Sequence, residues 1–193
     1  QWMTAGRGLV HSEMPEQQEG RMRGFQLWVN LPAALKMSEP QYQEFAPERV
    51  PVAHPAEGVM VKVIAGEVVD ASGAAVRGPI MQPATDPLYL DIELGADMAW
   101  TLALPMGHNA FVYVYEGGIS VGPGEGARPV EKQELGVLGS GDKLSLRASS
   151  NGARLILVAG RPLREPVARH GPFVMNTREE LMQAFVDFKA GRF

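Results

Sequence analysis

The sequence predicts an all-β fold, and three observations support this prediction. The chain of 193 residues contains 22 glycines and 15 prolines, which bound short apolar runs throughout the chain. Many of these runs alternate apolar and polar residues, which is the period of a strand with one buried face. A helix of several turns is expected only near the C-terminus.

Residues 1–31 are predicted to form the closing strands of a first barrel. Between Gly24 and Pro32 the side chains alternate, which places Gln26 and Trp28 on one face and Phe25, Leu27 and Val29 on the other. Pro32 ends this strand pattern, because proline cannot donate a backbone hydrogen bond.

A second barrel is predicted after a linker. Residues 32–58 are richer in Pro, Glu and Gln, and we expect an extended linker there with a short helical turn near its start. The strand pattern resumes at residue 59, which predicts one intact barrel over residues 59–165. Its expected strands are residues 59–68, 88–94, 100–104, 110–115, 137–146 and 153–159.

The segment 166–193 is predicted to be a C-terminal tail that ends in a helix. Thr177 followed three residues later by Glu180 is the pattern of a capping box. An apolar stripe at helical spacing follows, and its members are Leu181, Ala184, Phe185 and Phe188.

Composition and charge exclude several classes of function. The 18 basic and 22 acidic side chains leave a formal net charge of −4 with no dense basic cluster, which argues against direct binding to nucleic acid phosphates. No apolar run approaches the roughly 20 residues of a membrane-spanning helix, and a cytoplasmic location is expected. Because the chain contains no cysteine, any metal must be bound by His, Asp, Glu or water.

The most informative short motif is His11-Ser12-Glu13, which lies in the apolar stretch 8–15. Successive side chains of a strand alternate between faces, so His11 and Glu13 would point the same way. One nitrogen and one oxygen ligand would then converge, as in the mixed sites of non-haem iron. The alternative interpretation is a solvated pair on the wet face of an ordinary strand.

The other three histidines predict no metal site. His108 is followed at the next same-face position by Ala110, which offers no ligand, and the last strands of the second barrel contain no histidine. His54 and His170 lie in segments rich in proline and glycine, where an exposed or hydrogen-bonded loop histidine is expected. The barrel over residues 59–165 is therefore predicted to bind no metal.

Several longer motifs carry a resemblance to a known family. They are residues 1–15 (QWMTAGRGLVHSEMP), 24–32 (GFQLWVNLP), 37–43 (MSEPQYQ), 107–117 (GHNAFVYVYEG), 160–167 (GRPLREPV) and 171–177 (GPFVMNT). The chain closely resembles the pirin family of the cupin superfamily, in this order and over essentially its whole length.

The resemblance implies a bicupin, a pair of β-barrel cupin domains, with a metal in the first. In pirins the N-terminal cupin binds iron through a His-x-His pair, a later His and a Glu two residues after it, and His11 and Glu13 match the last two. The pair is expected upstream of Gln1, so the chain resembles a pirin that is truncated at its N-terminus, with an incomplete first cupin. Fe(II) is the expected metal, and other divalent transition metals are alternatives. The tail at 166–193 is expected to pack on the N-terminal cupin.

The resemblance also implies two classes of function, an enzyme and a non-enzymatic regulatory protein. The first is an iron-dependent dioxygenase of the quercetin 2,3-dioxygenase type, in which oxygen opens the heterocyclic ring of a flavonol and carbon monoxide is released. Glu13 would be the catalytic residue, as a metal ligand or as acceptor of the flavonol hydroxyl proton, and Gln26 and Trp28 would line the substrate pocket. The truncated chain by itself is expected to be inactive.

Two alternatives stay open from the sequence. One is a non-enzymatic protein that senses metal or redox state and binds a partner protein. The other retains the dioxygenase but assigns it a different small phenolic or diketone substrate, because the cupin scaffold supports many reactions.

Overall fold

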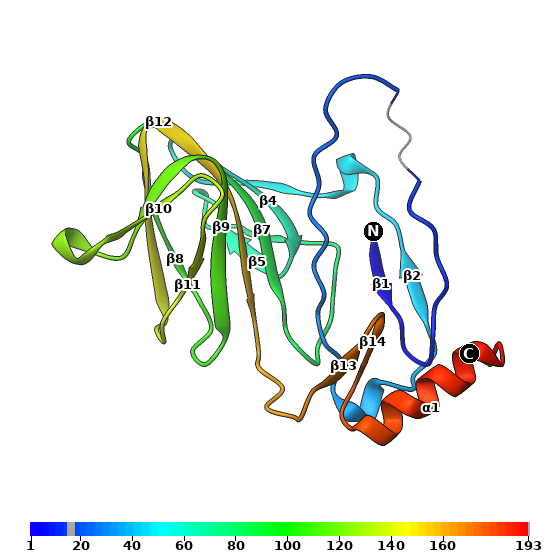
Figure 1. Ribbon diagram of the computed structural model, residues 1–193. Coiled ribbons are helices and arrows are strands. Elements are labelled where there is room, and N and C mark those ends of the chain that lie inside the picture. The colour runs from blue at the N-terminus through cyan, green and yellow to red at the C-terminus, as the bar shows by residue number, and fades with distance from the viewer. Residues whose placement is uncertain (15–17, 193) are drawn as a thin grey trace. The chain divides into compact units, whose positions relative to one another are not determined.

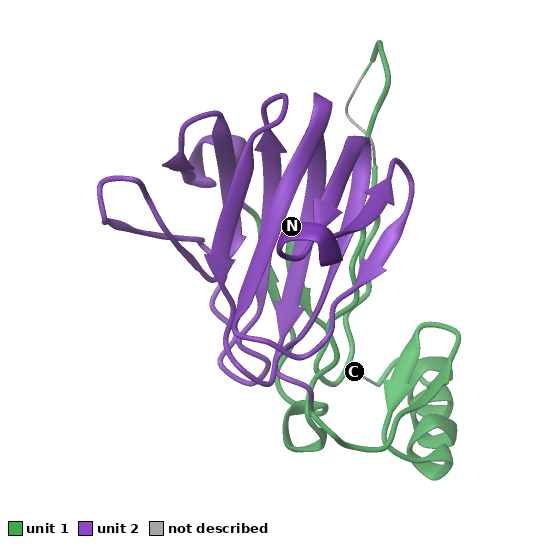
Figure 2. Cartoon of the chain, turned by 90° about the vertical axis from the view of Figure 1, so that its left-hand side faces the viewer, with its two compact units in different colours: residues 1–44, 163–193 green, residues 45–162 purple. Residues whose placement is uncertain are grey.

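A computed structural model describes residues 1–14 and 18–192. The chain divides into two compact units, which we call unit 1 (residues 1–44 and 163–193) and unit 2 (residues 45–162) (Figure 2). Pro15 and Phe193, which belong to predicted segments, lie outside the described residues. The all-β prediction is confirmed: apart from short 3-10 turns, the described elements are strands and one C-terminal α-helix.

Unit 2 is built on an antiparallel sheet with the order β10-β9-β12-β7-β4-β3, to which β11 adds on β9 and β8 adds on β12 (Figure 1). Its strands are β3 (Val52–Ala56), β4 (Val59–Ala65), β7 (Leu88–Leu94), β8 (Ala99–Ala103), β9 (Asn109–Val121), β10 (Arg128–Glu131), β11 (Leu135–Val137) and β12 (Lys143–Gly160). A separate small ladder pairs β5 (Glu67–Val69) with β6 (Ala75–Arg77).

The long strand β12 lies in the middle of this sheet. Its first part pairs with β8 and its second part with β7, while β9 lies along its other edge. An irregularity in the β9–β12 register falls between Ala148 and Ala153. Gly117 and Gly152 both have positive φ there, and a Cβ at Gly117 would lie 2.1 Å from the Gly152 carbonyl oxygen. Only glycine fits this close approach, which lets the sheet bend around its core.

Alternate residues of these strands form the core of unit 2. In β4 and β7 every second side chain is buried, as the period of two predicts. The largest fully buried side chains are Leu90, Ile92, Leu94, Leu146, Leu155, Leu157, Val61, Val63, Val112 and Val114. The core is therefore mainly aliphatic, and Trp100 is its buried aromatic side chain among the described residues.

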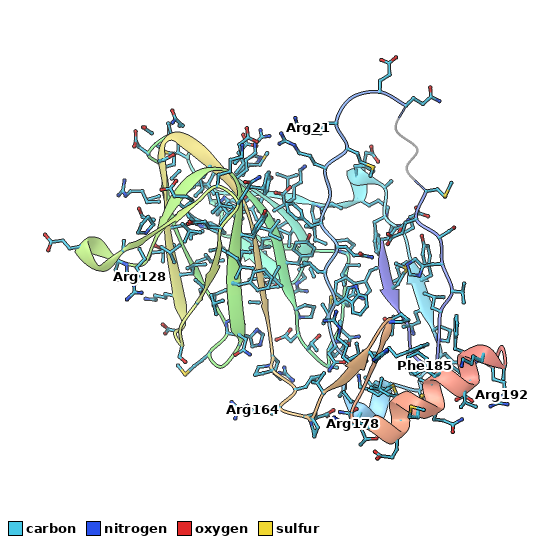
Figure 3. The ribbon with its side chains drawn as sticks, in the orientation of Figure 1. Arg21, Arg128, Arg164, Arg178, Phe185 and Arg192 are labelled. Atoms are coloured by element: carbon cyan, nitrogen blue, oxygen red, sulfur yellow. The ribbon has the colours of Figure 1, made fainter. Side chains whose placement is uncertain are left out.

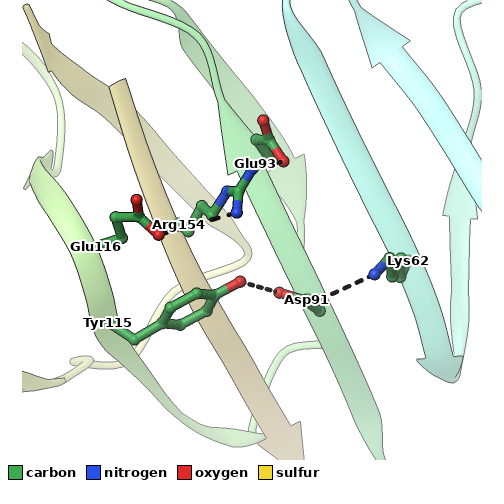
Figure 4. Close-up of polar contacts among 6 residues, drawn as sticks. All are labelled: Lys62, Asp91, Glu93, Tyr115, Glu116 and Arg154. Carbon is green, nitrogen blue, oxygen red and sulfur yellow. Dashed lines mark hydrogen bonds and ion pairs between the residues drawn. The ribbon is translucent and has the colours of Figure 1, made fainter. Parts of the chain in front are cut away.

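The opposite face of the same strands carries a polar network, drawn in Figure 4. Its members are Lys62, Asp91, Glu93, Tyr115, Glu116 and Arg154. Arg154 Nη2 lies 3.0 Å from Glu93 Oε2, and its Nη1 lies 3.8 Å from Glu116 Oε2. These pairs join neighbouring strands and favour their register by a few tenths of a kcal/mol up to about 1 kcal/mol each.

Unit 1 contains two short ladders and the helix. Strand β1 (Trp2–Thr4) pairs with β2 (Gln41–Gln43), and β13 (Ala168–His170) pairs with β14 (Phe173–Met175). Helix α1 (Arg178–Lys189) begins at the predicted capping box, with Thr177 Oγ1 accepting from the Glu180 backbone N–H. Phe185 of α1, labelled in Figure 3, packs edge-to-face on Phe173 at 4.9 Å between ring centroids.

Three segments differ from the sequence-based prediction. Residues 8–14 and 21–32 are not strands in the structure, because their backbones pair with no described neighbouring strand. The predicted linker, residues 32–58, contains β2 and β3 together with 3-10 turns at Ala33–Leu35 and Pro47–Arg49. Strand β3 joins the large sheet because Val52 and Ala53 pair with β4.

No helix in the described part of the chain is long and apolar enough to cross a membrane.

Candidate functional site

All four predicted site residues lie in unit 1, and two of them, His11 and Gln26, contact a third, Glu13. His11 Nε2 lies 3.7 Å from Glu13 Oε1, and Gln26 Nε2 donates a hydrogen bond of 2.8 Å to the same carboxylate oxygen. His11 and Glu13 are neighbours in sequence, but Gln26 reaches them from the following extended segment. The amide of Gln26 therefore restricts the orientation of the Glu13 carboxylate.

The His11–Glu13 pair is partly open to solvent. The side chains are 39% and 56% exposed, respectively. An ion pair of this exposure is screened by water and adds little to stability. Both side chains are accessible to a ligand, and neither is required to hold the fold together.

Trp28, the fourth predicted residue, contacts the C-terminal tail instead. Its indole is 59% exposed, and the Arg169 guanidinium carbon lies 5.4 Å from the ring centroid. This geometry is that of a cation–π interaction. Arg169 belongs to β13, far along the sequence, and no periodicity or motif in the sequence indicates this pairing.

A buried lysine anchors the next residues of the same segment. Lys36 Nζ donates to Asn30 Oδ1 at 2.6 Å and to the Val174 carbonyl oxygen at 3.0 Å. Burial lowers the pKa of Lys36, while the nearby carboxylates of Glu165 and Glu180 partly oppose that shift. Glu165 itself accepts the Ala33 backbone N–H at 2.7 Å. The tail and the N-terminal segment are thus joined by the partly buried Lys36–Val174 bond and the exposed Ala33–Glu165 bond.

The chemistry of the donors fits a transition metal, but the described donors are too few to enclose one. Imidazole nitrogen and carboxylate oxygen are the ligand types of non-haem iron sites. Ligand atoms lie about 2.0–2.2 Å from a transition metal, so two of them can be up to roughly 4.4 Å apart, and the 3.7 Å separation of His11 and Glu13 is compatible. Residues 1–14 and 18–192 contain no group of three or more His, Cys, Asp or Glu placed to bind one ion.

The histidines of unit 2 have other surroundings. The His108 side chain is only 6% exposed, and its Nε2 lies 3.6 Å from Asp86 Oδ2. Arg161 Nη2 lies 3.8 Å from the same Asp86 oxygen, so a guanidinium also faces the carboxylate that lies beside His108. His54 lies in β3, where its backbone N–H donates to Asp70 and lowers the pKa of that carboxyl group.

The remaining histidine, His170, lies in unit 1 at the end of β13. Its ring packs edge-to-face on Phe185 at 5.4 Å between centroids. This contact gives His170 a packing role in the small aromatic cluster that connects the β13–β14 hairpin to α1.

Comparison with known proteins identifies two family models along the chain. The model described as Pirin matches residues 1–29, and the model described as Pirin C-terminal cupin domain matches residues 89–193. The first match contains His11, Glu13, Gln26 and Trp28, and the second contains Arg169 and the tail.

Individual relatives agree with these matches. A pirin-like protein of Caulobacter vibrioides is 52% identical over 194 residues, which cover 100% of this chain and 67% of that protein. Pirin of Homo sapiens is 42% identical over 190 residues, which cover 98% of this chain and 63% of that protein. The chain thus spans about two thirds of the length of these curated relatives.

A solved structure shares the fold. The crystal structure of quercetin 2,3-dioxygenase from Acinetobacter baumannii superposes with a TM-score of 0.76 at 33% sequence identity, over 85% of this chain and 54% of that one. Together with the two family models and the relatives that match along its whole length, this similarity shows that the chain belongs to the pirin family.

Proposed function

We propose that this protein is a metal-dependent dioxygenase of the quercetin 2,3-dioxygenase type, with iron as its metal and a flavonol as its substrate. The observation that carries the proposal is the convergence of His11 Nε2, Glu13 Oε1 and the Gln26 amide at one partly exposed point. The similarity to the Acinetobacter baumannii enzyme supports the reaction type. Family membership supports the bicupin organisation that the reaction requires.

Each side chain of the proposed site has a distinct role in the reaction. His11 and Glu13 would supply two ligands to the metal, and upstream residues of the whole protein would supply the rest. A bound iron would supply the Lewis-acid and redox chemistry of ring opening. Glu13 accepts the proton of the flavonol 3-hydroxyl group, and Gln26 holds that carboxylate in the orientation needed to receive it. The indole of Trp28 offers an exposed planar surface for the aromatic rings of the substrate.

Metal analysis tests the ligand assignment. We expect the whole protein, which includes the upstream ligands, to contain close to one equivalent of iron, and we expect both His11→Ala and Glu13→Ala to reduce its metal affinity at least about tenfold, because loss of even an indirect partner of a ligand costs that much. His54→Ala removes an exposed imidazole in unit 2 and serves as the matched control. Mass spectrometry of the bound metal gives the readout. Equal metal content in all four proteins would refute the assignment.

Turnover separates the enzyme from the alternatives. Oxygen consumption and carbon monoxide release with quercetin are expected from the metal-loaded protein. Ring opening of another phenol or diketone, with quercetin inert, would retain the dioxygenase and replace its substrate. Metal binding without any turnover, combined with partner binding that follows the oxidation state of the metal, would replace the enzyme by a metal-sensing regulatory protein.

A further inference from the structure

A cation from the C-terminal tail lies beside the exposed aromatic ring of the candidate site. The Arg169 guanidinium carbon is 5.4 Å from the centroid of the Trp28 indole, and the indole is 59% exposed. A guanidinium stays charged at every pH that the folded protein tolerates. Any flat ligand that stacks on Trp28 therefore lies within range of a permanent positive charge.

Alternate residues of one segment hold the indole beside the candidate metal ligands. Gln26 bonds to Glu13, Trp28 contacts Arg169, and Asn30 accepts from Lys36. Two residues of chain span at most about 7 Å, so the backbone of Trp28 lies within that distance of the backbone of Gln26, whose amide bonds to Glu13. One ligand can contact both.

The tail holds Arg169 in place from a second direction. Arg169 and Val174 are directly paired across the β13–β14 ladder. Val174 in turn accepts the buried Lys36 ammonium at 3.0 Å, and Lys36 also binds Asn30. Both residues of this pair therefore contact the segment that carries Trp28. Arg169 contacts the Trp28 ring, and Val174 binds Lys36, which binds Asn30. This double attachment pre-organises the guanidinium over the ring and reduces the entropy lost on binding.

We infer that Arg169 is a specificity-determining residue of the site, and that it favours planar phenolates over neutral aromatic ligands of the same shape. The inference rests on the proposed function, which places a flavonol on Trp28. A flavonol carries acidic hydroxyl groups and can bind as a phenolate anion, whereas unsubstituted flavone has no hydroxyl group to ionise. The guanidinium then attracts the bound anion, whereas it gives no comparable advantage to an uncharged ring system.

Ligand binding to the metal-free protein tests this inference with two probes, quercetin and unsubstituted flavone, by quenching of tryptophan fluorescence. Arg169→Gln should weaken quercetin binding about 3- to 10-fold, which corresponds to about 0.7–1.4 kcal/mol for the loss of one partly exposed charge–charge attraction, and leave flavone binding unchanged. Arg169→Lys, which keeps the charge but not the planar group, should recover part of the loss. Arg178→Gln removes an exposed charge in the first turn of α1 and serves as the control.

A double-mutant cycle distinguishes a direct effect from a structural one. In a Trp28→Ala background, Arg169→Gln should change quercetin affinity by less than twofold, because the ring that holds the ligand beside the guanidinium is absent. Equal losses for quercetin and flavone, or an unchanged quercetin affinity in Arg169→Gln, would overturn the role of Arg169 while leaving the proposed function intact. Failure of the unmodified protein to bind quercetin would overturn the role of Arg169, whereas absence of turnover by the metal-loaded whole protein would overturn the proposed function.

Discussion

Tyr115 illustrates how neighbours set the chemistry of a single residue. Its hydroxyl donates to Asp91 Oδ1 at 2.7 Å, and Lys62 Nζ lies 3.8 Å from the other oxygen of Asp91 (Figure 4). Burial, followed by this hydrogen bond, raises the pKa of Tyr115 above its usual range. The folded state therefore keeps the phenol protonated where an unfolded tyrosine would ionise.

The raised pKa predicts a pH-dependent contribution to stability. The contribution of Tyr115 to the free energy of unfolding should be constant below about pH 10 and decrease as the pH rises further, because the unfolded state then releases a proton that the folded state retains. Tyrosinate absorbance should show a fraction of the four tyrosines that ionises late, and Tyr115→Phe should diminish that fraction. Tyr42→Phe removes an exposed phenol in unit 1 and should leave it unchanged. An identical titration in Tyr115→Phe would contradict the assignment.

Helix α1 is the element whose start the sequence predicts most directly. Thr177 Oγ1 accepts the Glu180 N–H at 3.1 Å, and the Glu180 carboxylate accepts the Thr177 N–H at 2.9 Å. Each bond satisfies a backbone donor that a helix N-terminus leaves unpaired. The aromatic contacts of Phe173 with Phe185 and Phe188 then attach the helix to the β13–β14 hairpin.

Removal of the cap should destabilise unit 1 measurably. Thr177→Ala is expected to lower the free energy of unfolding of α1 and its hairpin by about 1 kcal/mol, while Thr177→Ser, which keeps the hydroxyl, should cost much less. Helical circular dichroism during thermal unfolding gives the measurement. A Thr177→Ser variant as unstable as Thr177→Ala would show that the methyl group matters more than the hydrogen bond.

At the scale of the whole molecule, stability should be distributed unevenly. Strands β7 and β12 have a strand on either side and contribute much of the buried aliphatic core, whereas residues 21–32 belong to no described helix or strand. Hydrogen exchange measured by mass spectrometry should find the slowest amides in β7 and β12 and fast exchange in residues 21–32. Comparable protection in both regions would mean that residues 21–32 form backbone hydrogen bonds in solution.

Binding of a flavonol should slow exchange around Trp28 if the proposed site is correct.

The sequence by itself was sufficient for the all-β class, for strands such as β4, β7 and β8, and for the capped helix, the family and the His11–Glu13 pair. It missed β10, and it predicted one strand over residues 137–146, where the structure has the end of β11 and the start of β12. Periodicity and short motifs report which face of an element is buried and which neighbours in sequence can act together. Only the tertiary structure decided that residues 21–32 form no strand, that β3 joins the large sheet, and that Arg169 and Lys36 attach the tail to Trp28 and Asn30. A strand exists only where a neighbour supplies hydrogen bonds, and a partner distant in sequence leaves no periodic signal. The choice of such partners depends on the packing of the whole chain.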